Sequence, residues 1–129
     1  MKHVSRRELG KQGEDIAALF LEQQGYKIIE RNHRNKLGEI DIIAVEGSVL
    51  CFIEVKTRTT SSFGFPEEAV KVKKQRKISQ IVLSYLKLHK IEENDLRFDV
   101  VAVSFNELDK EPKINLIKHA FELDSNYFF

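Results

Sequence analysis

Three charged residues lie within two apolar segments, and their types are those that metal-assisted hydrolysis uses. Asp41 interrupts the run at residues 38–44, and Glu54 and Lys56 lie in the run at residues 50–56. Both runs otherwise have the composition of buried β-strands. Charges in such places are costly unless they are paired or bound to a metal ion. A function that uses these three side chains is therefore the first hypothesis.

The alternation of side chains along a strand predicts which of these residues share a face. In the first segment, Glu39, Asp41 and Ile43 are expected on one face. The remaining apolar residues of that segment are expected on the other face: Ile40, Ile42 and Ala44. In the second segment, Glu54 and Lys56 share a face. If the two segments form a hairpin, the carboxylates come together on one side of the sheet.

Two registers of this hairpin would bring Asp41 and Glu54 to the same face. A two-residue turn at Glu46 and Gly47 gives paired residue numbers that sum to 93, and places Glu39 opposite Glu54. A four-residue loop gives a sum of 95 and opposes Asp41 to Glu54 directly. Both registers bring the carboxylates together with Lys56, so the sequence leaves them open.

Carboxylates held close together repel one another and favour a bound cation. Oxygen ligands without Cys or His favour Mg²⁺ or Mn²⁺ over zinc. Such an ion can activate water and stabilise charge on a phosphate, while Lys56 could orient the attacking water or stabilise the developing negative charge. The residues therefore suit metal-assisted phosphodiester hydrolysis. The alternative is a solvent-facing ladder in which Glu54 and Lys56 lie on an exposed sheet surface.

The remaining sequence predicts the elements that position these residues. Ser5 and Glu8 form a capping box that opens a first helix, and Gly25 fits the position after its end. Strands are expected at 26–31, 37–45, 49–56, 96–105 and 114–118, with a second helix over 72–89 and a Ser/Thr/Gly loop over 57–65. The glycines of the first helix, Gly10 and Gly13, could allow close approach to the sheet. The pattern predicts an α/β domain with a mixed sheet flanked by two helices.

Length and composition indicate one globular domain over residues 1–129. Hydrophobic residues make up 42% and charged residues 32% of the chain, which excludes a disordered protein. There is neither an apolar run near 18 residues nor a signal-peptide pattern, and no membrane association is expected. The single cysteine, Cys51, is expected in the core. These features predict a cytoplasmic, reduced protein.

The motifs around the three charged residues resemble a known family. Asp41 with Glu54-Val55-Lys56 is similar to the D…(D/E)XK motif of the PD-(D/E)XK nuclease superfamily. A wider set of motifs resembles the YraN-like family, a widespread bacterial group: Gly13-Glu14, Arg31-Asn32-x-Arg34, Gly38-Glu39-Ile40-Asp41, residues 52–58, Phe63-Gly64, Lys74-Gln75, residues 97–101 and Ala120-Phe121. The resemblance covers nearly the whole chain and implies a restriction-endonuclease-like αβββαβ core, similar to that of archaeal Holliday-junction resolvases.

The resemblance implies a role for four residues. Asp41 and Glu54 would bind Mg²⁺ or Mn²⁺, Lys56 would be catalytic, and Glu14 would complete the acidic site from the first helix. Ile40 stands where the motif has a proline, which the superfamily often lacks. From spacing alone, Glu14 could equally be an ordinary helix acid.

Basic and polar residues around these positions are candidates for nucleic-acid binding: Arg34, Arg58, Lys74, Gln75 and Lys77. Residues 71–77 hold five positive charges, for which a solvated helix face is the alternative. Lys74 and Gln75 could instead form an exposed polar turn. Glu39 could join the metal site or pair with Lys36 or Arg34. Asp99 is expected to form a structural salt bridge, with Arg97 as one candidate partner.

The functional expectation is a Mg²⁺- or Mn²⁺-dependent nuclease that acts on DNA, including branched or junction structures. The net charge of +1 indicates weak intrinsic affinity for DNA, so a second copy of the chain or a protein partner could supply binding surface. Two alternatives stay open: a non-catalytic nucleic-acid-binding module, and a protein-interaction subunit of a DNA-processing complex.

Overall fold

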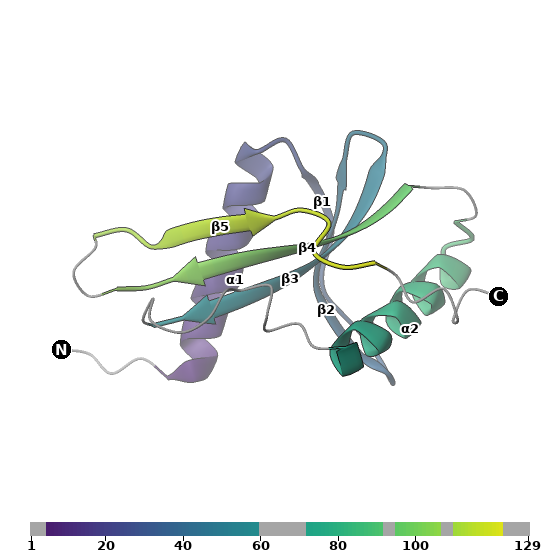
Figure 1. The fold of residues 1–129 in the computed structure, drawn as a ribbon, viewed down its shortest axis with the longest axis horizontal. Coiled ribbons are helices and arrows are strands. Elements are labelled where there is room, and N and C mark those ends of the chain that lie inside the picture. Colours follow the sequence, from purple (N-terminus) through teal and green to yellow (C-terminus); the bar gives the residue numbers. More distant parts are fainter. Residues whose placement is uncertain (1–4, 60–71, 92–94, 107–109, 123–129) are drawn as a thin grey trace.

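The computed structural model describes residues 5–59, 72–91, 95–106 and 110–122, without the side chains of residues 72 and 73. The described residues form two helices and five strands (Figure 1). In chain order they are α1 (Arg6–Gln23), β1 (Lys27–Asn35), β2 (Gly38–Glu46), β3 (Val49–Arg58), α2 (Val72–Leu88), β4 (Asp95–Ser104) and β5 (Lys113–Ile117). The predicted order αβββαββ is confirmed.

The five strands form one mixed sheet in the order β1-β2-β3-β4-β5. Neighbouring strands are antiparallel except β3 and β4, which are parallel. A parallel pair needs a crossover connection, and α2 lies in that connection. The helices cover opposite faces of the sheet, with α1 behind it and α2 in front of it in Figure 1. The predicted α/β class with a restriction-endonuclease-like core is confirmed.

Local sequence signals explain the ends of α1. Ser5 is the N-cap, and its hydroxyl accepts a hydrogen bond of 3.2 Å from the backbone N–H of Glu8. Gly25 follows the helix with a φ of +96°, a conformation in which glycine avoids the usual steric penalty. Among the described residues, no helix combines the length and apolar character needed to cross a membrane.

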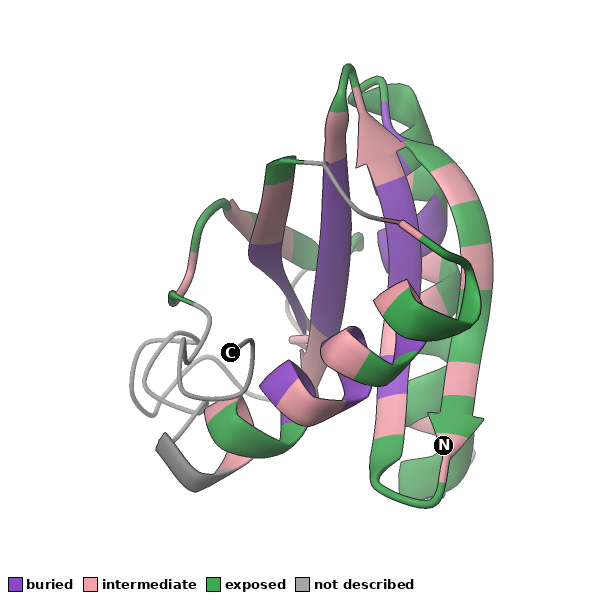
Figure 2. Cartoon of the chain, turned by 90° about the vertical axis from the view of Figure 1, so that its right-hand side faces the viewer, coloured by how far each residue is buried: buried purple, intermediate pink, exposed green. Residues whose placement is uncertain are grey.

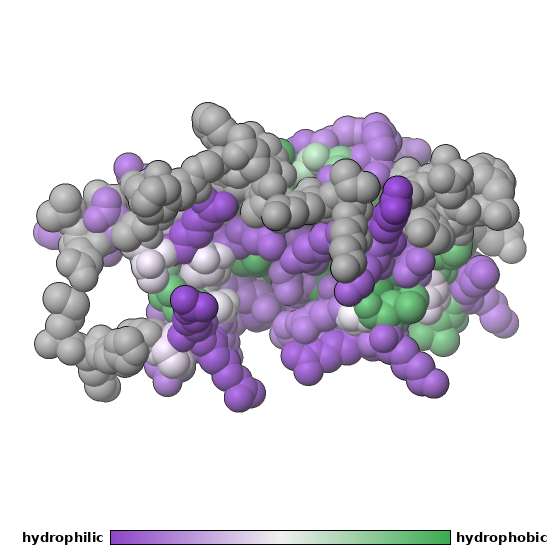
Figure 3. Space-filling model, turned by 60° about the horizontal axis from the view of Figure 1, so that its bottom comes forward, coloured by the Kyte–Doolittle hydropathy of each residue, from purple (hydrophilic) through white to green (hydrophobic). Residues whose placement is uncertain are grey.

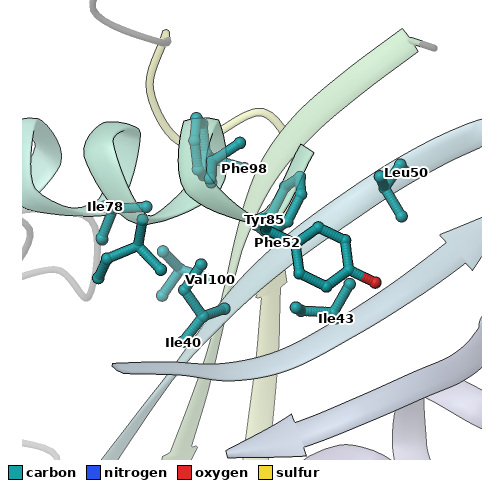
Figure 4. Close-up of a cluster of buried hydrophobic side chains, with 10 residues drawn as sticks. Ile40, Ile43, Leu50, Phe52, Ile78, Tyr85, Phe98 and Val100 are labelled. Carbon is teal, nitrogen blue, oxygen red and sulfur yellow. The ribbon is translucent and has the colours of Figure 1, made fainter. Parts of the chain in front are cut away.

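The sheet separates two apolar cores. The α2-side core consists of Ile40, Ile43, Leu50, Phe52, Ile78, Ile81, Val82, Tyr85, Phe98 and Val100 (Figure 4). The α1-side core consists of Ala17, Ala18, Leu21, Tyr26, Ile42, Ala44, Cys51, Ile53, Val101 and Val103. A fully buried side chain such as Phe52 contributes about 1.5–3 kcal/mol. Burial falls off toward β1, one of the two edge strands, whose residues are all exposed or intermediate (Figure 2).

The predicted boundaries agree with the structure to within two residues, except at the end of the first strand. The first strand reaches Asn35 rather than residue 31, because β1 follows β2 along its whole length. The third strand includes Thr57 and Arg58, which were predicted to begin a loop, because β4 pairs with β3 as far as Arg58. Residues 60–65 of that predicted loop lie outside the described residues. Cys51 is a buried free cysteine in the α1-side core, as predicted.

Asp99 belongs to a buried polar network on the face of β4 opposite Glu54. Its carboxylate accepts hydrogen bonds from the Tyr26 hydroxyl at 2.8 Å, from Arg97 Nε at 2.8 Å and from the His119 backbone N–H at 3.0 Å. Arg97 also pairs with Glu46 at 2.7 Å. This confirms the predicted structural salt bridge between Asp99 and Arg97.

Candidate active site

The candidate site lies where β2 and β3 separate. The two strands pair from Glu46 and Val49 at the turn to Ile42 and Ile53, and no further pair is formed between them. Beyond that point β3 continues alongside β4 alone. Asp41 and Glu54 are therefore the first residues past the last pair on their strands, on the two sides of a fork.

The register of this hairpin is the one in which paired numbers sum to 95. The turn that produces it contains two residues, Gly47 and Ser48, rather than the predicted four-residue loop. The alternative turn at Glu46 and Gly47 is wrong, because Glu46 still pairs with Val49. Gly47 has a φ of +61°, which favours glycine at this tight turn.

The Asp41 side chain occupies the fork between the strands. Its Oδ2 accepts a hydrogen bond of 2.8 Å from the backbone N–H of Val55. The carboxylate thus satisfies a β3 donor that β2 no longer reaches. Because a charge-assisted bond of this kind is strong, it fixes one oxygen of Asp41 beside the residue that follows Glu54.

The strict alternation predicted for this segment is wrong at Ile40. Ile40 packs in the α2-side core together with Ile43, whereas Ile42 packs in the α1-side core. Alternation would place residues 40 and 42 on the same face. The strand is therefore irregular at Asp41, the residue between them. In the neighbouring strand β1, Asn32 lies opposite this point and has a φ of +55°.

Glu54 is buried beside two lysines on the α2 side of the sheet. The residue is 6% exposed, and its Oε2 lies 3.1 Å from Lys74 Nζ on α2. Lys56 shares this face, as predicted, and lies beside Lys74. Burial and the neighbouring Lys74 lower the pKa of Lys56. Burial opposes the charge of Lys74 too, but the proximity of Lys56 and of the Glu54 carboxylate raises the pKa of Lys74 overall.

Glu14 lies on α1, and its charge acts on Asp41. The helix packs closely on β3 because Gly13 lacks a Cβ: a Cβ there would lie 2.0 Å from Oγ1 of Thr57. The prediction that a glycine of this helix allows close approach is confirmed for Gly13. It is wrong for Gly10, where an added Cβ would have no neighbour within 4 Å.

The pKa of Asp41 responds to the charges of three other carboxylates, those of Glu54, Glu14 and Glu39. Burial is the largest cause that raises the pKa of Asp41, followed by the charge of Glu54, and the pKa reaches about 7. The Val55 N–H opposes this rise, while the charges of Glu14 and Glu39 add to it. A cation at the fork would relieve this repulsion.

The donor set fits a hard divalent ion. Asp41 and Glu54 supply carboxylate oxygens, which Mg²⁺ and Mn²⁺ prefer, and Mg²⁺ is commonly bound by one or two carboxylates with several waters. In the described part of the chain, no three His, Cys, Asp or Glu side chains are grouped to hold one ion. The pair at the fork is thus the ligand set that the described residues offer, with Glu14 adding negative charge. The predicted metal-binding role of Glu14 stays a prediction.

The residues predicted to bind nucleic acid lie in different places. Lys74 is part of the site itself. Arg34 is 75% exposed and donates from Nε to Glu39 at 3.0 Å. This pairing was one of the two alternatives for Glu39. Arg58 is the last residue of β3, Gln75 is part-buried in α2, and Lys77 is exposed on α2.

Arg31 and Asn32 of β1, which from the sequence could bind nucleic-acid backbone or cap the sheet edge, donate hydrogen bonds to Glu14. Arg31 donates to Glu14 Oε1 from Nε at 3.2 Å and from Nη2 at 3.1 Å, and Asn32 donates from Nδ2 at 2.9 Å. No pattern in the sequence predicts that these residues contact Glu14. An asparagine inside a strand was the available signal, since Asn tolerates positive φ.

Comparison with known proteins agrees with the resemblance of the motifs. The chain is 46% identical over 118 residues to a UPF0102 protein of Caldicellulosiruptor saccharolyticus, which covers 92% of this chain and 100% of the relative. It is 48% identical over 114 residues to a UPF0102 protein of Syntrophus aciditrophicus, with 88% of each chain covered. The model of the uncharacterised protein family UPF0102 matches residues 13–103, which include Glu14, Asp41, Glu54 and Lys56. The chain therefore belongs to the UPF0102 family.

Proposed function

We propose that this protein is a divalent-metal-dependent nuclease that hydrolyses phosphodiester bonds in DNA. The observation that carries the proposal is the convergence of Asp41, Glu54 and Lys56 at the fork, where repulsion from Glu54 helps to raise the pKa of Asp41. Glu54 is paired with Lys74, yet its charge still raises the pKa of Asp41. A cation bound between the two carboxylates would relieve this repulsion.

In the proposed mechanism, Asp41 and Glu54 would hold Mg²⁺ or Mn²⁺, which would supply a lowered pKa for water and positive charge at the scissile phosphate. Groups of the chain would orient the carboxylate and the attacking water. Val55 N–H holds one oxygen of Asp41, so that the carboxylate is oriented before the substrate arrives. Lys56, whose pKa is lowered by burial and by Lys74, orients the attacking water or stabilises the developing charge.

Basic side chains near the site support DNA as the substrate. Lys74 lies in the site, and Arg76 and Lys77 are exposed on the same helix. Many hydrophilic side chains lie on the surface of the molecule that Figure 3 shows. Lys and Arg side chains of this kind bind phosphates without reading sequence, which suits substrates recognised by shape such as junctions and flaps. A second copy of the chain would match the symmetry of a four-way junction.

The test is a cleavage screen with labelled duplex, single-stranded, flap and four-way-junction DNA, each with Mg²⁺, Mn²⁺ or EDTA. The expected result is metal-dependent cleavage of at least one substrate. It should be lost in Asp41→Ala, Glu54→Ala and Lys56→Ala preparations that keep the far-ultraviolet circular dichroism of the unsubstituted chain. Preserved cleavage by a clean Asp41→Ala preparation would refute the proposal.

The ion pair between Lys74 and Glu54 favours a second candidate function. Because the ammonium at 3.1 Å already neutralises one carboxylate, the chain could bind nucleic acid without using a metal. A non-catalytic binding module would retain DNA in a salt-sensitive manner, with no turnover under any divalent ion. Failure to retain DNA or RNA at low salt would instead favour a protein-interaction subunit.

A further inference from the structure

Lys74 stands where the apolar stripe of α2 would otherwise continue. The residues that pack this helix on the sheet recur at helical spacing, and Ile78, Ile81 and Val82 are buried in the α2-side core. Lys74 precedes Ile78 by one turn, so it lies on the same side of the helix. The packing of α2 therefore directs the Lys74 ammonium to the sheet rather than into solvent.

The contact that Lys74 makes there is direct, and it falls on a proposed metal ligand. Its Nζ lies 3.1 Å from Glu54 Oε2. The Glu54 side chain is 8% exposed and the Lys74 side chain 42% exposed. The carboxylate is thus nearly closed off from water, whereas the lysine that covers it keeps contact with water and has room to leave.

Stability alone does not account for this arrangement. Charges taken out of water lose hydration, and a buried ion pair commonly stabilises a fold no more than apolar side chains of similar volume would. Lys56 also lies beside Lys74, so two ammonium groups share the surroundings of one buried carboxylate. Their repulsion would bring nothing to a purely structural pair.

We propose that Lys74 is the resident counter-ion of Glu54 and that a divalent ion has to displace it in order to bind. The ammonium occupies Oε2, one of the two oxygens that Glu54 can offer to an ion. This inference rests on the proposed function and adds a control to it, since the chain itself supplies a cation that competes with the metal. A charge-assisted contact of this kind corresponds to about 10- to 100-fold in an equilibrium constant.

Two substitutions of Lys74 and one matched control test the competition. Lys74→Met removes the charge and keeps an unbranched side chain with good helix propensity. Lys74→Gln removes the charge and keeps a polar end, in case the apolar variant folds poorly. Lys77→Met is the control, because it removes the same charge from an exposed position about one turn further along the same helix.

The experiment is isothermal titration with Mn²⁺ at pH 8, without DNA. We expect both Lys74 variants to bind Mn²⁺ about 10- to 100-fold more tightly than the unsubstituted chain. Lys77→Met should change the affinity by no more than about threefold, because solvent and salt screen an exposed charge. Urea unfolding gives a second readout: Mn²⁺ should raise the midpoint of Lys74→Met more than that of the unsubstituted chain, since tighter binding stabilises the folded state more.

The outcomes separate this inference from the proposed function. If the unsubstituted chain binds Mn²⁺ and the Lys74 variants bind it equally or more weakly, or if Lys77→Met tightens binding as much, the displacement is wrong and the proposed function stands. If neither the unsubstituted chain nor Lys74→Met binds Mn²⁺ in the millimolar range, the proposed function is wrong and this inference is lost with it. Binding by the Lys74 variants alone would support both.

Discussion

Replacing Asp41 by asparagine is expected to stabilise the metal-free protein at pH 8, although the substitution removes a central carboxylate of the proposed site. In the folded chain, burial and the charge of Glu54 raise the pKa of Asp41 from 3.8 to about 7. Above pH 7 folding must therefore place a charged carboxylate where the neutral form is preferred. Asparagine is neutral, and its amide oxygen can still accept the Val55 N–H.

The magnitude follows from linkage between protonation and folding. A pKa difference of one unit corresponds to about 1.4 kcal/mol, so a rise from 3.8 to about 7 corresponds to about 4 kcal/mol. Because Asp41 is part-buried rather than fully buried, we expect Asp41→Asn to raise the free energy of unfolding by about 2–4 kcal/mol at pH 8. The sign depends on pH. Below about pH 4 Asp41 is protonated in both folded and unfolded chains, and the gain should vanish.

The assay is urea unfolding in EDTA at pH 8 and pH 4. As pH rises from 4 through about 7, Asp41 loses its proton in the folded chain, and the unsubstituted protein loses stability. The difference in unfolding free energy between Asp41→Asn and the unsubstituted chain should therefore grow with pH over this range. Asp95→Asn is the matched control, since Asp95 is an exposed carboxylate at the start of β4 and its replacement should change stability little. No gain at pH 8, or an equal gain at pH 4, would refute the reasoning.

Two further predictions concern packing and the second buried aspartate. Gly13→Ala is expected to destabilise the fold by about 1–2 kcal/mol, because its Cβ would lie 2.0 Å from Thr57 Oγ1 and the cost of overpacking exceeds the helix-propensity gain. Gly10→Ala, with open space around it, should instead stabilise by up to about 1 kcal/mol; equal effects of both in thermal unfolding would contradict the close helix approach. Asp99→Asn should cost about 1.5–3 kcal/mol at pH 7, the opposite sign to Asp41→Asn, because it removes the charge of the buried carboxylate that accepts hydrogen bonds from Arg97 and Tyr26. A urea midpoint unchanged by Asp99→Asn would show that the polar network does not hold the sheet together.

The sequence predicted the elements well because each carries a local signal. The Ser5 cap, Gly25 and the apolar periodicity of both helices define where the helices lie, and alternation on β3 places Glu54 and Lys56 on one face. The same signals predicted that Asp99 would pair with Arg97. These features depend on residues close in sequence or on the binary pattern of a regular strand.

The irregular parts of the site could not be predicted in this way. The alternation of β2 fails at Asp41 because the strand leaves β3 there, and separation of two strands is a tertiary property. Nothing local distinguishes Ile40 from Ile42, yet they pack in different cores. The contact of Asn32 with Glu14 depends in the same way on a left-handed residue within a strand and on how closely α1 approaches β3.

The most direct test of the central claim is single-turnover cleavage by Asp41→Asn, on whichever DNA substrate the unsubstituted chain cleaves with Mn²⁺ at pH 8. We expect this variant to be more stable in EDTA than the unsubstituted chain and yet to cleave at least 100-fold more slowly, since the charge that destabilises the fold is the charge proposed to bind the ion. Loss of structure cannot explain a loss of activity in a more stable protein. Cleavage by Asp41→Asn at the rate of the unsubstituted chain would contradict the account.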